Sequence, residues 1–175
     1  MDRTREADEA RPCFFSPSPE STLAWGERLG ARLQPGSVLG LSAGLGVGKT
    51  QLVQGIARGY FEAPERVRVC SPSYTMINSY EQGHKRLHHI DLYRCASSDD
   101  LESIGYWDSL GDPLACCVIE WIRQVPDSLP SRFLELVLAL EKPDEALTTP
   151  RLICLGEVRD QALHAALAPL FGVSS

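Results

Sequence analysis

The strongest constraint on this chain is a glycine-rich segment, residues 43–50, which reads Ala-Gly-Leu-Gly-Val-Gly-Lys-Thr. The apolar run at 38–41 before it is typical of a short buried strand, and residues 51–58 after it have apolar positions spaced as in a helix. This order of strand, loop and helix is the context in which such a segment binds phosphate. Its glycines allow successive N–H groups to face phosphate oxygens, and the helix N-terminus adds partial positive charge. Residues 43–50 are therefore predicted to form a phosphate-binding loop, or P-loop.

Two side chains at the end of the P-loop have separate expected roles. Lys49 reaches the β and γ phosphates of a nucleotide and takes part in catalysis, and the Thr50 hydroxyl offers an oxygen to Mg²⁺. Ala43 stands where glycine is commoner, and we take this change as tolerated. The residues of this segment that are expected to bind nucleotide are Gly44, Leu45, Gly46, Val47, Gly48, Lys49, Thr50 and Gln51.

Length and composition predict one domain with a loose N-terminal extension. A chain of 175 residues suits a single domain, expected at 20–175, and residues 1–19 are charged and then rich in Ser and Pro. The net charge of −6, with no basic stripe, argues against direct binding of a nucleic-acid backbone. No secretory leader and no membrane-length apolar stretch is found, so a soluble cytoplasmic protein is expected, with its six cysteines reduced.

The remaining patterns predict alternating helices and strands. A first helix is expected from a cap at Ser21 or Thr22 to Leu33. Two alternating segments at 76–80 and 85–94 predict a hairpin inserted after the P-loop helix. Further helices are expected at 99–110 and about 160–170, and strands at 114–119, 133–140 and 151–155.

Two acidic residues complete the chemistry that a P-loop implies. Glu120 ends the apolar strand 114–119, where an acid holds Mg²⁺ in related folds; the alternative is an ordinary carboxylate at a strand end. Asp91 is a candidate catalytic residue that orients or deprotonates the attacking water. In the alternative reading of its segment, the flanking His88, His89 and Arg94 are surface residues of the hairpin, and we favour this over metal binding by the histidines.

In four motifs the chain resembles the bacterial TsaE (YjeE) proteins, the ATPases of tRNA threonylcarbamoyladenosine synthesis. The motifs are the P-loop followed by Gln-Gly-Ile-Ala-Arg-Gly at 54–59, Ser-Pro-Ser-Tyr-Thr at 71–75, His-Ile-Asp-Leu-Tyr-Arg at 89–94, and Val-Ile-Glu-Trp at 118–121. The resemblance implies an α/β P-loop NTPase fold with a mixed central sheet flanked by helices. It also implies that ATP and Mg²⁺ bind, with Thr50 and Glu120 at the metal.

The resemblance further implies roles for other residues and proteins. Asp91 would be the catalytic acid, the 71–75 segment would act as a switch near the γ-phosphate, and Trp121 would lie at the nucleotide. The expected partners are the TsaD and TsaB proteins, with tRNA reached only through that complex. The family commonly has Gly-Asp where this chain has Ala43-Gly44, so any role of that Asp is missing here.

Three functions are in competition. The first is a slow ATPase that serves a partner complex. The second is a small-molecule P-loop kinase, which would need an acceptor pocket and a lid carrying arginines. The third is a nucleotide-gated protein-binding module without useful turnover, against which Asp91 and Glu120 argue. GTP is disfavoured because the chain contains no Asn-Lys-x-Asp motif for reading guanine.

Overall fold

The computed structural model describes residues 11–62, 64–125, 128–141 and 150–172. The strands are β1 (Cys13–Ser16), β2 (Val38–Ser42), β3 (Ile77–Gln82), β4 (Lys85–Asp91), β5 (Ala115–Glu120), β6 (Leu134–Leu140) and β7 (Arg151–Val158). The α-helices are α1 (Pro19–Gly30), α2 (Lys49–Tyr60), α3 (Ser98–Ser103), α4 (Tyr106–Gly111) and α5 (Gln161–Leu167). Within the described ranges, 3₁₀ helices are found at η1 (Pro64–Arg66) and η4 (Ala168–Phe171).

The strands form one mixed sheet in the order β1-β7-β6-β2-β5-β4-β3. The four central strands, β6, β2, β5 and β4, run parallel to one another. The outer strands β3, β7 and β1 pair antiparallel. The expected α/β class with a mixed central sheet is therefore confirmed.

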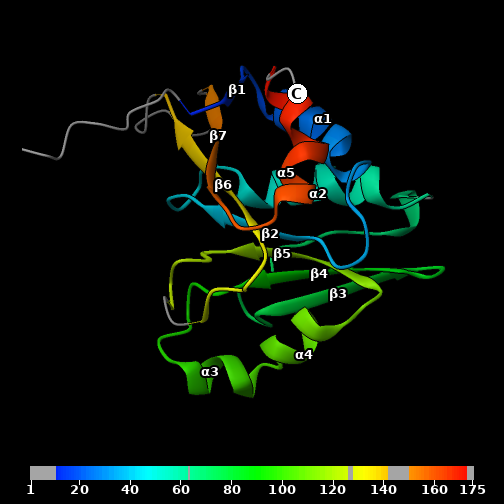
Figure 1. Ribbon diagram of the computed structural model, residues 1–175, viewed down its shortest axis with the longest axis vertical. Helices are drawn as coiled ribbons and strands as arrows, with labels where there is room; N and C mark the ends of the chain where they lie inside the picture. The colour runs from blue at the N-terminus through cyan, green and yellow to red at the C-terminus, as the bar shows by residue number, and fades with distance from the viewer. Residues whose placement is uncertain (1–10, 63, 126–127, 142–149, 173–175) are drawn as a thin grey trace, which may run out of the picture.

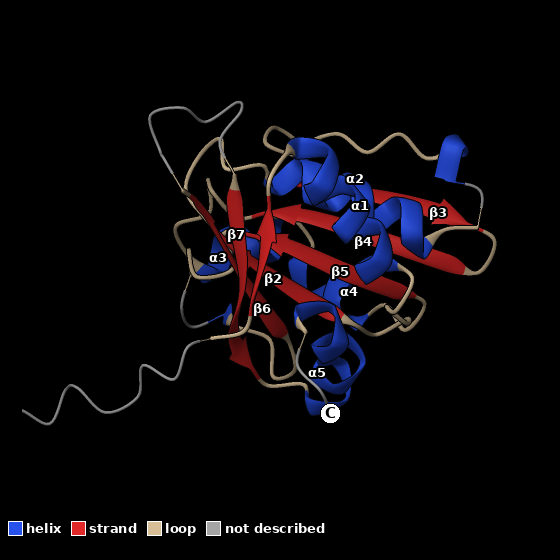
Figure 2. Ribbon diagram, turned by 90° about the horizontal axis from the view of Figure 1, so that it is seen from above, coloured by secondary structure: helices blue, strands red, loops and turns tan. Residues whose placement is uncertain are grey.

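Helices cover both faces of the sheet. Helices α1, α2 and α5 lie on one face, and α3 and α4 lie on the other (Figures 1 and 2). Each layer encloses a hydrophobic cluster: one contains Trp25, Leu52 and Ile56, and the other contains Leu101 and Tyr106. Strand β5 is buried along its whole length, as expected for a parallel strand between two helical layers.

The N-terminal region differs from its prediction. Strand β1 pairs with β7, so the domain boundary expected at residue 20 is too late; residues 1–10 of the expected extension lie outside the described residues. Helix α1 begins at Pro19 because the Ser18 hydroxyl caps it, accepting a hydrogen bond of 3.2 Å from the Ser21 N–H. The predicted cap at Ser21 or Thr22 is therefore wrong.

The middle of the chain confirms the predicted hairpin and shows how it joins the sheet. Strands β3 and β4 follow the P-loop helix and pair antiparallel, and β4 also pairs with β5, so the hairpin forms one end of the central sheet. The helix expected at 99–110 is divided into α3 and α4. Gly105 separates them with a φ of 75°, a left-handed conformation that glycine adopts at low cost.

Helices α1 and α2 are in backbone contact through glycines. A Cβ atom at Gly30 would lie 2.0 Å from the Ile56 carbonyl oxygen, and one at Gly55 would lie 2.3 Å from the Leu23 carbonyl oxygen. Because neither backbone can move without shifting its helix, these glycines fix how closely α2 lies on α1. Helix α2 follows the P-loop directly, so this contact also fixes the loop.

A disulfide joins the two outermost strands on the β1 side of the sheet. Cys13 of β1 and Cys154 of β7 lie directly opposite each other and are bonded. The expectation of reduced thiols is wrong for this pair. Cys70, Cys95, Cys116 and Cys117 are free. Among the described residues, no helix has the length and apolar character needed to cross a membrane.

Candidate nucleotide site

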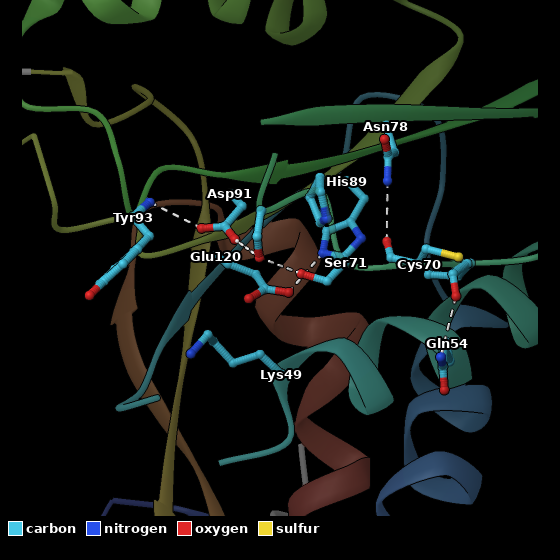
Figure 3. Close-up of polar contacts among 12 residues, drawn as sticks. Lys49, Gln54, Cys70, Ser71, Asn78, His89, Asp91, Tyr93 and Glu120 are labelled. Atoms are coloured by element: carbon cyan, nitrogen blue, oxygen red, sulfur yellow. Dashed lines mark hydrogen bonds and ion pairs between the residues drawn. The ribbon is translucent and has the colours of Figure 1, made fainter. Parts of the chain in front are cut away.

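The predicted site residues meet at one edge of the sheet. Strands β2, β5 and β4 are parallel neighbours, and their register places Leu41 beside Glu120 and Glu120 beside Asp91. The P-loop leaves the end of β2 at the same edge. In Figure 3, Lys49, Glu120 and Asp91 point toward one another although they come from three different elements.

The P-loop has the backbone that its glycines predict. Gly46 and Gly48 have φ values of 74° and 104°, and Gly48 precedes the first residue of α2 with no side-chain cap. The N–H groups at this helix end are therefore available to an anion. Lys49 is buried, and its Nζ donates to the Gly44 carbonyl oxygen at 2.8 Å. Burial lowers the pKa of Lys49, while Glu120 and Asp91 act in the opposite direction.

A cavity of about 290 Å³ lies between the P-loop and the two acids. It is lined by Leu45, Gly46, Gly48, Lys49, Thr50, Ser71, Ser73, Asp91, Tyr93, Glu120 and Trp121. Most predicted residues therefore lie at one cavity, but Gly44, Val47 and Gln51 do not line it. The carbonyl oxygen of Gly44 accepts a hydrogen bond from Lys49, which does line the cavity.

Glu120 is held by a histidine that the sequence analysis placed on the surface. His89 Nε2 lies 2.8 Å from Glu120 Oε1, and both side chains are buried. The reading of His88 and His89 as surface residues is wrong, because β4 lies inside the sheet between β3 and β5. His88 bonds to Ser79 and Asp112 instead, away from the cavity. His89 lies two residues before Asp91, and this spacing puts both side chains on the same face of a strand. That spacing was the sequence signal for the position of His89.

Asp91 is held on both carboxylate oxygens. Its Oδ1 accepts from the Tyr93 N–H at 3.0 Å, and its Oδ2 accepts from the Ser73 hydroxyl at 3.1 Å. Ser73 in turn bonds to Ser71 at 2.7 Å. The 71–75 segment is thereby connected to the predicted catalytic acid, as a segment that responds to the γ-phosphate would need to be.

Trp121 closes the cavity beside Lys49. The Lys49 ammonium lies 4.6 Å from the centre of the Trp121 ring, and the Tyr93 ring lies 5.0 Å from it. Trp121 has a φ of 60°, an uncommon conformation for a bulky residue. Strained backbone of this kind persists where surrounding contacts fix it, and it is concentrated at functional sites. Arg94 is exposed, packs on the Tyr74 ring at 5.1 Å and does not line the cavity.

The donor atoms at the cavity suit magnesium bound together with phosphate. The described residues contain no group of three or more His, Cys, Asp or Glu able to hold a metal. Mg²⁺ bound with nucleotides uses one or two carboxylates, substrate phosphates and waters, and does not need a closed protein cage. The Thr50 hydroxyl and the Glu120 carboxylate supply oxygen atoms of the required kind.

A further buried carboxylate, outside the cavity, supports β2 just before the P-loop. Glu135 accepts hydrogen bonds from Ser42 at 2.5 Å, from Arg123 at 2.6 Å and from the Glu157 N–H at 3.0 Å. Burial alone would raise the pKa of Glu135, but these bonds and the Arg123 charge outweigh it and lower the pKa to about 2. The sequence analysis did not single out Glu135, and its position in the apolar strand β6 offered the only signal.

Known proteins resemble this chain over most of its length. A family model described as threonylcarbamoyl adenosine biosynthesis protein TsaE matches residues 16–148. A Synechocystis protein named tRNA threonylcarbamoyladenosine biosynthesis protein TsaE is 37% identical over 121 residues, which is 68% of this chain and 74% of that protein. The Bacillus subtilis protein of the same name is 35% identical over 129 residues, covering 73% and 77%.

A solved structure shows the same fold. The crystal structure of Bacillus subtilis YdiB superposes with a TM-score of 0.67 at 26% identity, covering 90% of this chain and 92% of that one. The expected P-loop NTPase fold is thus confirmed. Taken with the family model and the two relatives, this match shows that the chain belongs to the TsaE family of tRNA threonylcarbamoyladenosine biosynthesis proteins.

Proposed function

We propose that the chain is a slow, magnesium-dependent ATPase required for threonylcarbamoylation of the adenosine next to the anticodon in tRNA. The observation that carries the proposal is the meeting of Lys49 and Thr50 with Asp91 and Glu120 around one cavity. A loop that offers N–H donors and an ammonium group faces two carboxylates, which is the division of roles found in P-loop triphosphatases. Family membership supports the tRNA pathway.

The P-loop side of the cavity would bind the triphosphate. Lys49 has three donors, so it can keep its bond to Gly44 and still offer two N–H groups to phosphate oxygens. The Thr50 hydroxyl and Glu120 would hold Mg²⁺, which when bound neutralises charge on the phosphates. His89 keeps the Glu120 carboxylate in one orientation, as second partners of metal ligands do.

Asp91 would act on the attacking water. Its two oxygens are fixed by Tyr93 and Ser73, so the carboxylate is oriented before substrate binds. A carboxylate accepts a hydrogen bond from water and thereby aims the water lone pair at the γ-phosphate. The hydrogen bond from Ser73 connects the 71–75 segment to Asp91 and so to this step.

The isolated chain should turn over slowly and depend on partners. Among the described residues, no arginine lines the cavity, and triphosphatases without an arginine finger in place are slow until another protein supplies one. We propose TsaD and TsaB as those partners and the cytoplasm as the compartment. The net charge of −6 supports contact with tRNA only through the complex. The Cys13–Cys154 disulfide is unusual for that compartment, and thiol counting on acid-trapped protein tests its state there.

Phosphate release from purified protein tests the proposal. We expect slow Mg²⁺-dependent release from the chain alone and a clear increase when TsaD, TsaB and tRNA are all present. Threonylcarbamoyl transfer should continue only when ATP can be hydrolysed. Fast release by the chain alone would indicate an independent ATPase, and phosphoryl transfer to a small acceptor would indicate the kinase alternative.

A further inference from the structure

Arg151, the first residue of β7, is a buried cation that contacts the P-loop from far along the chain. It pairs in register with Leu140 of β6 and Ser16 of β1, and it is 4% exposed. Its Nε–H donates a hydrogen bond of 2.7 Å to the backbone carbonyl oxygen of Val47. Charged side chains are rarely buried to this extent unless they are paired, so the position calls for a physical reason.

The guanidinium group lies against the bare Cα of Gly48. A Cβ atom on Gly48 would lie 2.9 Å from Nε and 3.4 Å from Cζ of Arg151. Gly48 lines the cavity and Arg151 does not, so Arg151 contacts the loop from the side away from the cavity. A side chain at position 48 would therefore displace the guanidinium group.

The peptide between Val47 and Gly48 connects Arg151 to the cavity. In a trans peptide the carbonyl and the following N–H point in opposite directions. Because Arg151 holds the Val47 carbonyl on the side away from the cavity, the Gly48 N–H is turned toward it. A hydrogen bond to the carbonyl also polarises the peptide, which makes the N–H a stronger donor.

The charge of Arg151 has no ion-pair partner in the described part of the chain. No salt bridge there includes Arg151, and its Nη1 atom has no hydrogen-bond partner there. The exposed Glu20 carboxylate is influenced by Arg151 without forming an ion pair with it. An unpaired buried cation is costly, and an anion bound on the other face of the loop lowers that cost, since screening is weak there.

We propose that Arg151 is a positioning residue for phosphate binding by the P-loop. It aims the Gly48 N–H into the cavity through Val47, and its buried charge attracts the phosphates bound on the opposite face of the loop. The inference rests on the proposed nucleotide-binding function and adds a residue from the C-terminal strand to that site.

Substitutions that separate donor from charge test this role. Arg151→Gln keeps an N–H donor but loses the charge, Arg151→Lys keeps both, and Arg58→Gln is the control, an exposed arginine on α2. Calorimetric titration of the full chain with ATP, ADP and adenosine is the measurement, with far-UV circular dichroism as the check of folding. We expect Arg151→Gln to weaken ATP and ADP binding about tenfold and to leave adenosine binding unchanged. The affinity of Arg151→Lys for ATP and ADP should lie between the affinities of Arg151→Gln and the native chain. The affinity of Arg58→Gln should equal that of the native chain.

The selectivity for phosphate distinguishes positioning from general support of the fold. Native ATP affinity in folded Arg151→Gln overturns the proposal, and so does an equal loss for ATP and adenosine. If only Arg151→Lys folds, its ratio of ATP to adenosine affinity must fall severalfold, and an unchanged ratio overturns the proposal. If neither variant folds, the role is structural and the proposal is wrong. Failure of the native chain to bind ATP would instead overturn the proposed function.

Discussion

The two walls of the cavity are built in different ways. The P-loop wall, residues 45–50, is one continuous segment that presents backbone N–H groups and the Lys49 ammonium. The acid wall consists of Asp91 and Glu120, which end separate strands, with Ser71 and Ser73 from the preceding loop. The first wall attracts phosphate, and the second repels it unless a cation lies between them. Under the proposed function, this difference predicts that ATP binding depends on the P-loop wall and that hydrolysis depends on the acid wall.

The largest effect should come from Asp91→Asn, because the proposed role of this carboxylate is mainly in the transition state. We expect the hydrolysis rate to fall at least about a hundredfold while ATP affinity stays within a few-fold of native. Single-turnover phosphate release and calorimetric titration measure the two quantities. Asp108→Asn, an exposed residue on α4, is the matched control. If Asp91→Asn hydrolyses ATP at the native rate, Asp91 is a structural residue and the acid wall has no catalytic part.

Lys49→Ala tests the opposite wall. Loss of charge-assisted contacts to phosphate should weaken ATP binding by on the order of tenfold to a hundredfold. The ring of Trp121 lies against Lys49, so tryptophan fluorescence during ATP titration is a direct readout. Arg58→Ala removes a positive charge from the other end of α2 and should change nothing. Native affinity in Lys49→Ala would show that the loop is only a turn.

A smaller effect is expected from His89→Gln. His89 does not line the cavity, but it contacts Glu120 of the acid wall. Altered orientation of Glu120 should raise the Mg²⁺ concentration needed for half-maximal hydrolysis by about tenfold, the size typical of second partners of metal ligands. Glu120→Gln should shift the requirement further. The control is His84→Gln in the exposed turn between β3 and β4. An unchanged Mg²⁺ requirement would mean that His89 serves packing alone.

The smallest effect on nucleotide handling is expected from Glu135, which lies outside both walls. Its pKa falls from an ordinary 4.5 to about 2 on folding, so its stabilising contribution is present above pH 4.5 and is lost as the pH falls toward 2. The difference between the two values corresponds to about 3 kcal/mol at neutral pH. Glu135→Gln should therefore lower the free energy of unfolding at pH 7 by that order and reduce its decline between pH 5 and 2.

Urea unfolding across this pH range measures the effect of Glu135, and exposed Glu102→Gln is the control. ATP affinity of the folded Glu135→Gln chain should stay near native. A large loss of affinity would show that the Ser42–Glu135 bond helps to shape the P-loop, and the site would then extend beyond its two walls.

The contrast between the walls also explains what the sequence could predict. The P-loop wall is encoded by adjacent residues, so its glycines and Lys49 were identified without knowledge of any distant contact. The placement of Asp91 beside Glu120 required that both strands be parallel neighbours in register, which the hairpin pattern alone did not establish. His89 was misplaced for the same reason, since its burial depends on β4 lying between β3 and β5 inside the sheet.

Contacts between distant segments were not predictable. Arg151 reaches Val47 across 104 residues, and Cys13 meets Cys154 across 141. Both contacts depend on β7 lying between β6 and β1, and no local pattern specifies that order of strands. The cap at Ser18 was missed for a simpler reason: the Ser-Pro repeat before α1 resembles a loose linker, although Pro19 also suits the first position of a helix.

The glycine contact between α1 and α2 affects how variants of this chain should be interpreted. Gly55 and Gly59 belong to the segment that follows the P-loop, so a substitution there resembles an active-site lesion. Neither residue lines the cavity, and a Cβ at Gly59 would meet the Glu27 carbonyl oxygen of α1. A loss of activity in such a variant would therefore report the displacement of a helix, transmitted to the phosphate-binding end of α2. Because each clash is with backbone atoms of α1, no side-chain substitution on α1 can relieve it. Such a variant should lose folding stability together with ATP binding, whereas the loss of a catalytic group leaves both intact.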